Sequence, residues 1–239
     1  MTRLLFRDDA YLREAPARVT GHTAEGGIEL DASLFYPAGG GQPGDAGWLD
    51  HDGGECVIAT TVKSPDGLPV LVPAAPGPLP PVGATIVQRL DWDLRYRHMR
   101  MHTALHLLSV AVPLPVTGGQ IGAGKGRLDF DMPHAPEDRE ALDSALAELA
   151  ARDLPVTEAW ITDAELEANP GLVKTMSVRP PAGAGRVRLI RIGEGRGQVD
   201  LQPCGGTHVA RTSEIGRPRL GKIEKKGARN RRVYLHLDD

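Results

Sequence analysis

A proline-rich segment limits how this chain can fold. Five prolines lie between Pro73 and Pro81. Because proline lacks the amide donor and fixes φ, this segment can form neither a helix nor a central strand. We therefore predict a surface loop here. The sequence before it is typical of strands and the sequence after residue 90 is typical of helix, so we predict two domains, residues 1–90 and 91–239.

The first domain is predicted to be rich in β structure. Its short apolar segments are separated by Gly, Asp and Pro, and the expected strands include residues 27–30, 48–49, 57–58 and 70–72. Glycine and proline are frequent, at 29 and 20 residues, whereas aromatic residues make up only 4%. We expect a small β-barrel or a strongly bent sheet with many turns and an aliphatic core.

A glycine run lies within this first domain. Gly39, Gly40 and Gly41 are not followed by the Gly-Lys-Ser/Thr ending of a phosphate-binding loop, and they lack the GxGxxG spacing. The run therefore predicts a backbone turn with positive φ or a close approach of the backbone to another segment, and it implies no ATP.

Helices are expected at the start of the second domain. Residues 93–112 contain good helix formers and stop before Pro113. A second helix is expected over residues 136–151, with a proline in its first turn and an apolar face.

Strands are expected in the rest of the second domain, which makes its predicted class α+β. The segments at residues 186–192 and 198–201 favour strands, and residues 220–226 and 231–237 favour a terminal hairpin. Alternation within the last strand predicts three side chains facing the core: Val233, Leu235 and Leu237.

Charge is distributed unevenly along the chain. The formal net charge is -3, but residues 1–170 contain 13 Lys and Arg against 25 Asp and Glu, whereas residues 171–239 contain 15 against 6. The C-terminal third is therefore a candidate surface for a polyanion, although like charges also gather on ordinary solvated faces.

Cysteine usage and hydropathy indicate the expected compartment. Cys56 and Cys204 are too few and too far apart for a disulfide framework, and Cys56 is expected to be a small buried residue. The longest apolar stretch, residues 107–116, contains two prolines and is shorter than the ~20 residues that cross a bilayer. We expect no signal peptide, no membrane contact and a reducing cytoplasm.

Two short motifs carry potential metal ligands. His102 and His106 are four residues apart on the first predicted helix, which places both imidazoles on one face. Cys204 and His208 flank a Gly-Gly-Thr turn, and Cys and His are ligands that zinc prefers. Thr103 follows His102 where a helical metalloprotease needs Glu, so the peptidase interpretation lacks its base. Four protein ligands fit a closed structural site, and a catalytic site would need one of them to act outside the coordination shell.

Three segments together resemble a known family. They are Leu34-Phe-Tyr-Pro-Ala-Gly-Gly-Gly-Gln-Pro-Gly-Asp-Ala-Gly-Trp48, Arg100-Met-His-Thr-Ala-Leu-His-Leu-Leu108 and Cys204-Gly-Gly-Thr-His208. In this conjunction the chain resembles the free-standing alanyl-tRNA editing proteins of the AlaX type and the editing domain of alanyl-tRNA synthetase. The resemblance covers nearly the whole chain and implies a small barrel-like domain followed by a zinc-binding editing domain of the threonyl/alanyl-tRNA synthetase type.

The resemblance also implies an activity and a partner. Such a protein hydrolyses the ester of mischarged tRNA(Ala), chiefly Ser-tRNA(Ala), with Gly-tRNA(Ala) left open, and contacts the acceptor end of the tRNA. No obligate protein partner is implied. One Zn²⁺ per chain is implied, held by His102, His106, Cys204 and His208. The zinc could activate water or only orient the ester, and the sequence does not choose.

The resemblance assigns further residues to the site. Gln120 and Ser33 are the candidate catalytic residues, although Gln120 is equally consistent with a turn residue and Ser33 stands where the family commonly has Thr. The candidate substrate-binding residues are Gly205, Gly206 and Thr207. The candidate tRNA-binding residues are Arg217, Arg219, Lys222, Lys225, Lys226, Arg229, Arg231 and Arg232.

Two other functions remain open at this point. One is a zinc-stabilised tRNA-binding module without hydrolysis, which the closed ligand count and the basic C-terminal segment both permit. The other is a zinc hydrolase of another aminoacyl or peptidyl ester. Turnover separates the first of these from the editing enzyme, and comparison of substrates separates the second.

Overall fold

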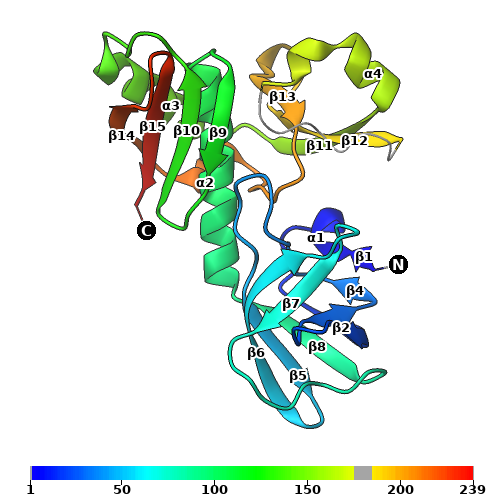
Figure 1. The fold of residues 1–239 in the computed structure, drawn as a ribbon. Coiled ribbons are helices and arrows are strands. Elements are labelled where there is room, and N and C mark those ends of the chain that lie inside the picture. The colour runs from blue at the N-terminus through cyan, green and yellow to red at the C-terminus, as the bar shows by residue number, and fades with distance from the viewer. Residues whose placement is uncertain (1, 175–184, 239) are drawn as a thin grey trace. The chain divides into compact units, whose positions relative to one another are not determined.

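A computed structural model describes residues 2–174 and 185–238 of the chain (Figure 1). The chain forms two compact units, Met1–His98 and Met99–Asp239. The long helix α2 (Trp92–Ala111) contains the division between them. The predicted boundary at residue 90 lies just before this helix, where the last strand of the first unit ends.

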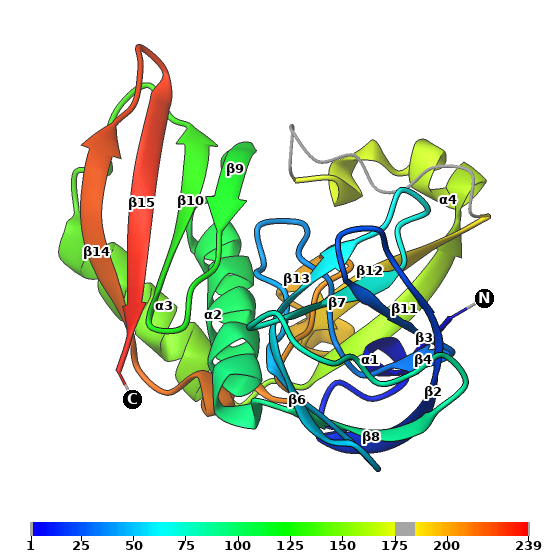
Figure 2. The same ribbon diagram turned by 60° about the horizontal axis from the view of Figure 1, so that its bottom comes forward.

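The first unit is a closed six-stranded barrel, as its sequence predicts. Neighbouring barrel strands are antiparallel. In order around the barrel they are β2 (Glu14–His22), β3 (Ile28–Leu30), β7 (Pro69–Pro73), β6 (Gly54–Lys63), β5 (Gly47–His51) and β8 (Thr85–Leu90). Outside the barrel, β1 (Arg3–Leu4) pairs in parallel with β4 (Ala32–Ser33), and α1 (Leu5–Asp8) follows β1. Figure 2 shows the strands curving around a common centre.

The interior of the barrel is mainly aliphatic. Val19, Ile28, Leu30, Leu49 and Leu71 are at most 1% exposed. Cys56 is also buried, as expected. Alternation along each strand explains this, because successive side chains point to opposite faces and every second one enters the core.

The glycine run forms the predicted turn beside the barrel. Gly40 and Gly41 have φ of 59° and 84°, values that glycine adopts without the steric cost other residues bear. A buried ion pair fixes the start and end of this segment, because Arg95 contacts both Asp45 and the Leu34 carbonyl. Asp45 in turn accepts a hydrogen bond from the Tyr36 amide.

The second unit contains two antiparallel sheets and the helices α2, α3 (Arg139–Ala151) and α4 (Asp163–Ala168). The four-stranded sheet has the order β14 (Pro218–Lys225), β15 (Asn230–Leu237), β10 (Lys125–Asp131) and β9 (Val116–Gln120). The three-stranded sheet has the order β11 (Val156–Thr162), β12 (Arg186–Ile192) and β13 (Asp200–Pro203). Three short 3₁₀ helices complete the described elements: η1 (Pro170–Leu172), η2 (Gly195–Gly197) and η3 (Thr212–Ile215).

The four-stranded sheet supports the long helix. Figures 1 and 2 show α2 and α3 against one face of this sheet. Gly126 of β10 allows the close approach, because a Cβ there would lie 2.6 Å from the Met101 sulfur and 3.1 Å from Leu105. Val233, Leu235 and Leu237 are buried, as their alternation predicts.

Two predicted element boundaries shift for local reasons. The helix expected from residue 136 begins at Arg139, because the Asp138 side chain caps it by accepting from the Ala141 amide. The strand expected at residues 198–201 is β13, Asp200–Pro203, because η2 occupies the segment just before it.

Among the described residues, no helix is long and apolar enough to span a membrane.

Candidate metal centre

The long helix supplies the first half of a cluster of metal-binding side chains. His102 and His106 are 8% and 7% exposed, and their ring centroids lie 5.3 Å apart. The four-residue spacing stacks the two imidazoles one turn apart on α2, as the sequence predicts.

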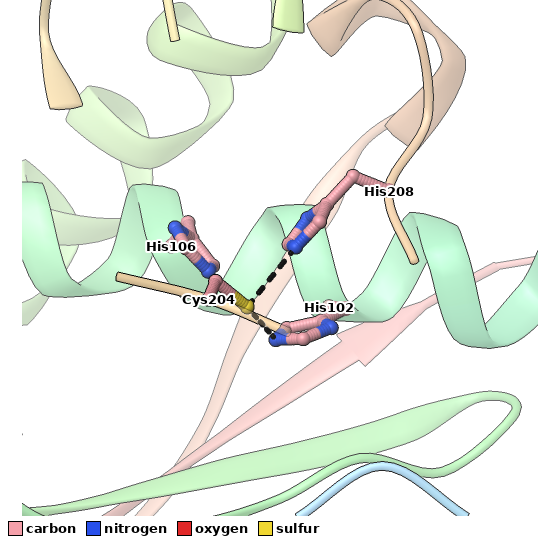
Figure 3. Close-up of side chains that lie close together, drawn as sticks. All are labelled: His102, His106, Cys204 and His208. Atoms are coloured by element: carbon pink, nitrogen blue, oxygen red, sulfur yellow. Dashed lines mark hydrogen bonds between the residues drawn. The ribbon is translucent and has the colours of Figure 1, made fainter. Parts of the chain in front are cut away.

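The turn after β13 supplies the second half. The Cys204 sulfur lies 3.4 Å from His102 Nε2 and 3.3 Å from His208 Nε2 (Figure 3). One candidate ligand atom from each of His102, His106, Cys204 and His208 lies within 4.8 Å of the others, so this group could hold a metal ion. The structure therefore brings together four side chains that are up to 106 positions apart in the sequence.

A buried arginine supports the backbone of this turn. Arg188 of β12 donates from Nη1 to the carbonyls of Cys204 and Gly206, both at 2.9 Å, and its Nη2 pairs with Glu158. The Cys204 amide also donates to the Arg188 carbonyl. Two carbonyls of the turn are thereby satisfied by one charged group, a strong arrangement in a buried position. Gly205 is exposed, with open space where a Cβ would stand.

Hydrogen bonds set which nitrogen of His208 faces the cluster. Thr103 donates its hydroxyl proton to the Met99 carbonyl at 3.0 Å. The same oxygen lies 3.2 Å from His208 Nδ1 and accepts from the Val209 amide. Because the hydroxyl proton is already donated, Thr103 can only accept from Nδ1–H, which leaves Nε2 bare and directed at Cys204.

The electrostatics of the cluster favour a thiolate. Burial raises the pKa of the Cys204 thiol, but the neighbouring His102 and His208 outweigh burial and hold that pKa well below its ordinary value. Burial and the charge of His102 hold the pKa of His208 well below its ordinary value. Burial lowers the pKa of His106, whereas hydrogen bonds with Asp200 and Cys204 raise it, to a net value of about 9. A thiolate among imidazoles is an arrangement that a divalent cation would stabilise.

The donor set fits zinc. Zinc bonds of about 2.3 Å to sulfur and 2.0–2.1 Å to nitrogen in a tetrahedron place neighbouring ligand atoms about 3.3 to 3.6 Å apart. The two sulfur–nitrogen distances, 3.4 and 3.3 Å, lie within about 0.3 Å of the sulfur–nitrogen separation of about 3.5 to 3.6 Å that such bonds give. One Cys and three His, with the Nε2 of His208 bare and a low-pKa thiol, are a typical zinc ligand set.

The predicted catalytic residues belong to strands that carry none of the four cluster side chains. Gln120 is the last residue of β9, exposed, and its side-chain oxygen accepts from Arg127 Nε at 3.2 Å. It therefore lies at a strand end rather than inside a turn. Ser33 belongs to the first unit, is fully buried, and its hydroxyl bonds with the backbone of Phe35.

The predicted basic surface is partly neutralised by acids. Arg229 pairs with Asp131 and Arg232 pairs with Asp129, both acids of β10. Lys225 and Arg217 have no acidic partner within residues 2–174 and 185–238. The remaining ion pairs are Arg219 with Asp238, and Lys222 and Lys226 with Glu224. Arg231 donates to the backbone carbonyls of Pro133, Gly227 and Asn230.

Sequence analysis missed the residues that support the cluster. Thr103 and Asp200 lie close to ligands in the sequence and Arg188 does not, but no motif indicates that these three side chains bond with His208, His106 and the turn carbonyls. The acids of β10 were missed for the same reason, because they lie about a hundred positions before the arginines that they contact.

A largely buried Cys/His₃ cluster that could hold a metal ion lies between a helix and a strand turn, in a protein of mixed α and β structure. Residues 187–234 match the family described as the threonyl and alanyl tRNA synthetase second additional domain. The chain is 35% identical to the alanyl-tRNA editing protein AlaX-M of Methanosarcina acetivorans over the full length of both. It is 33% identical to AlaX-M of Saccharolobus solfataricus, covering 98% of each chain. The chain belongs to the AlaX-M family of alanyl-tRNA editing proteins.

The chain also matches part of a larger protein. The alanine–tRNA ligase of Caldivirga maquilingensis is 36% identical over 94% of this chain, which spans 25% of the ligase. The chain thus matches a segment of the ligase and the whole of the AlaX-M proteins.

Proposed function

We propose that this protein is a trans-editing hydrolase that deacylates mischarged tRNA(Ala), chiefly Ser-tRNA(Ala), with Gly-tRNA(Ala) as a second substrate to be tested. Full-length similarity to alanyl-tRNA editing proteins carries this proposal. The two free cysteines favour the cytoplasm, where charged tRNA is used. We also propose that the chain has two domains, residues 1–90 and residues 91–239.

The need for such an enzyme follows from binding energetics. A pocket for alanine rejects a substrate with an added hydroxyl by only about 10²-fold. A second site that hydrogen-bonds the serine hydroxyl leaves its polar groups unpaired when alanine enters, which can discriminate by roughly 10⁴ to 10⁵. Correctly charged Ala-tRNA(Ala) is then spared.

We assign one Zn²⁺ per chain to His102, His106, Cys204 and His208. When bound there, zinc supplies Lewis acidity for polarising water or an ester carbonyl. The Cys204-Gly-Gly-Thr-His208 turn is the proposed contact for the aminoacyl ester, through Gly205, Gly206 and Thr207. The exposure of Gly205 and the engagement of the neighbouring carbonyls by Arg188 support this assignment.

Gln120 and Ser33 are the proposed polar groups for the substrate. The Gln120 amide can donate and accept, so it suits an amine, a hydroxyl or a water. Its oxygen accepts from the partly buried side chain of Arg127, and this bond leaves its NH₂ group available. Ser33 keeps a hydroxyl but lacks the methyl group that stiffens a threonine side chain.

We further propose that the basic residues of β14, β15 and their connection contact the acceptor stem. Among the described residues, Lys225 and Arg217, which lies just before β14, have no acidic partner, so they should contribute more per side chain than those paired with acids. The double variant Lys225→Glu, Arg229→Glu should weaken tRNA binding and reduce the slope of log affinity against log salt by about 1 to 2. Unchanged affinity at several salt concentrations would remove this surface from the proposal.

The activity is tested by amino-acid release. Ser-tRNA(Ala), Gly-tRNA(Ala) and Ala-tRNA(Ala) are incubated with a catalytic amount of zinc-loaded protein and with a chelator-stripped sample. We expect fast, zinc-dependent release of serine with alanine spared. Absence of hydrolysis with retained tRNA binding would favour a binding module, and hydrolysis of an unrelated aminoacyl ester with all three tRNAs spared would favour another zinc hydrolase.

A further inference from the structure

A buried carboxylate lies directly behind one of the cluster histidines. The Asp200 side chain is fully buried, and its Oδ2 lies 2.9 Å from His106 Nδ1. Asp200 begins β13, four residues before Cys204. The same strand therefore carries both a candidate ligand and a group that contacts another candidate ligand.

Three donors converge on this carboxylate. Oδ2 accepts from His106 Nδ1 and from Gln202 Nε2 at 2.8 Å, and Oδ1 pairs with Lys174 Nζ. Gln202 Nε2 and His106 Nδ1 lie 3.0 Å apart because both donate to the same oxygen. A buried carboxylate with three donors stays ionised and acts only as an acceptor.

This arrangement determines the tautomer of His106. Because Oδ2 can only accept, Nδ1 must carry the proton, and a neutral His106 then presents a bare Nε2 to the cluster. The carboxylate also fixes the rotation of the ring about its side-chain torsions. Ser109 belongs to the same hydrogen-bond network, since its hydroxyl accepts from Gln202 and donates to the His106 carbonyl.

Lys174 balances the charge of Asp200. Its side chain is 29% exposed, so the ammonium group reaches the buried carboxylate from the edge of the site. An unpaired buried carboxylate is costly, and the lysine offsets that cost without touching the histidine.

We propose that Asp200 is a positioning residue for the metal centre, acting through His106, and that Lys174 anchors the Asp200 carboxylate through its other oxygen. The inference rests on the proposed zinc site, and it names two residues outside the ligand set. Outer carboxylates of this kind typically change metal affinity by about 10- to 100-fold when they are altered.

Zinc affinity of the full-length protein, measured by competition with a chromophoric chelator, tests the proposal. Asp200→Asn keeps the shape but removes the obligate acceptor, and we expect it to bind zinc about 10- to 100-fold more weakly than wild type. Lys174→Met should cause a smaller, several-fold loss. Asp143→Asn is the matched control, because Asp143 accepts from the Leu220 amide in another part of the second unit. The control should bind zinc as wild type does.

A second readout separates positioning from general loss of structure. The ring nitrogens of His106, followed by ¹⁵N NMR in the metal-free protein above the raised pKa of about 9, where the ring is neutral, should show a protonated Nδ1 in wild type and an altered Nδ1 signal in Asp200→Asn. Wild-type zinc affinity and an unchanged signal in a folded Asp200→Asn would overturn the inference. If Asp200→Asn does not fold, a wild-type affinity in Lys174→Met together with a neutral Nε2–H tautomer in wild type would overturn it. A wild-type protein that binds no zinc would instead defeat the proposed metal site itself.

Discussion

The two halves of the metal centre are built in different ways. The helix half, His102 and His106, needs only the repeat of an α-helix to bring its side chains together. The turn half, Cys204 and His208, needs Arg188 and Thr103 from elsewhere in the second unit to fix its carbonyls and its imidazole. A local motif can therefore create half of a site, whereas the other half depends on the tertiary fold.

Loss of a ligand from either half should have the largest effect. Cys204→Ala and His102→Ala should both lose bound zinc, measured by elemental analysis, and should lower deacylation of Ser-tRNA(Ala) by about 10²-fold or more, because each removes one of four metal ligands. If Cys204→Ala keeps both zinc and activity while His102→Ala loses them, the turn is only structural and the two halves do not form one centre.

Removal of the arginine that holds the turn should come next. Arg188→Met leaves the carbonyls of Cys204 and Gly206 and the Glu158 carboxylate without their donor. We expect the free energy of unfolding, measured in urea, to fall by about 2 to 3 kcal/mol and zinc affinity to fall about tenfold. Arg211→Met is the control, because Arg211 forms an exposed pair with Asp153, and exposed pairs contribute little to stability, so this variant should unfold nearly as wild type does. Equal effects of the two variants would contradict the role given to Arg188.

A smaller effect is expected at Thr103, which links the two halves. Thr103→Val keeps the shape but removes the acceptor for His208 Nδ1, so we expect zinc affinity to fall several-fold and stability by about 1 kcal/mol. Thr103→Ser retains a hydroxyl and should restore most of the affinity. A serine variant as weak as the valine variant would show that packing, rather than the hydrogen bond, is the relevant contribution.

The smallest effect concerns the sheet that supports the helix half. Burial raises the pKa of Asp129, but hydrogen bonds from Arg232 and Arg127 outweigh it and hold that pKa below its ordinary value. The stabilisation that the ionised Asp129 contributes is therefore complete above the ordinary pKa near 3.8. It is lost as the pH falls through the lower pKa that Asp129 has in the folded protein. Asp129→Asn should lower the free energy of unfolding by about 1 kcal/mol at pH 7.

Acid unfolding measures this contribution directly. The difference between Asp129→Asn and wild type should shrink as the pH falls below about 4. A difference that is constant from pH 7 to pH 3 would show that the charge of Asp129 does not support the sheet.

The sequence predicts those parts of the structure that depend on local patterns. The helix α2 follows from its helix formers and the proline after it, β12 follows from residues that favour strands, and the inward side chains of β15 follow from alternation. The barrel follows from short apolar segments and turns, and the ligand cluster follows from two motifs with suitable chemistry. The start of α3 is misplaced by three residues because Asp138, rather than Pro136, ends the preceding loop as the helix cap.

Long-range contacts could not be predicted from one sequence. Arg188 and Asp200 act on the cluster because β12 and β13 pair and bring them to it, and neither lies in a recognisable motif. The neutralisation of Arg229 and Arg232 by Asp131 and Asp129 requires the pairing of β10 with β15. Such contacts depend on strand order and register, which periodicity does not specify.

The coordination shell of the loaded protein tests the central claim most directly. X-ray absorption at the zinc edge reports the ligand atoms and their distances. We expect one sulfur at about 2.3 Å and nitrogen ligands at about 2.0 to 2.1 Å from one zinc per chain, with the sulfur absent from any metal bound by Cys204→Ala. A wild-type shell without sulfur would contradict the joining of the helix half and the turn half in one metal centre.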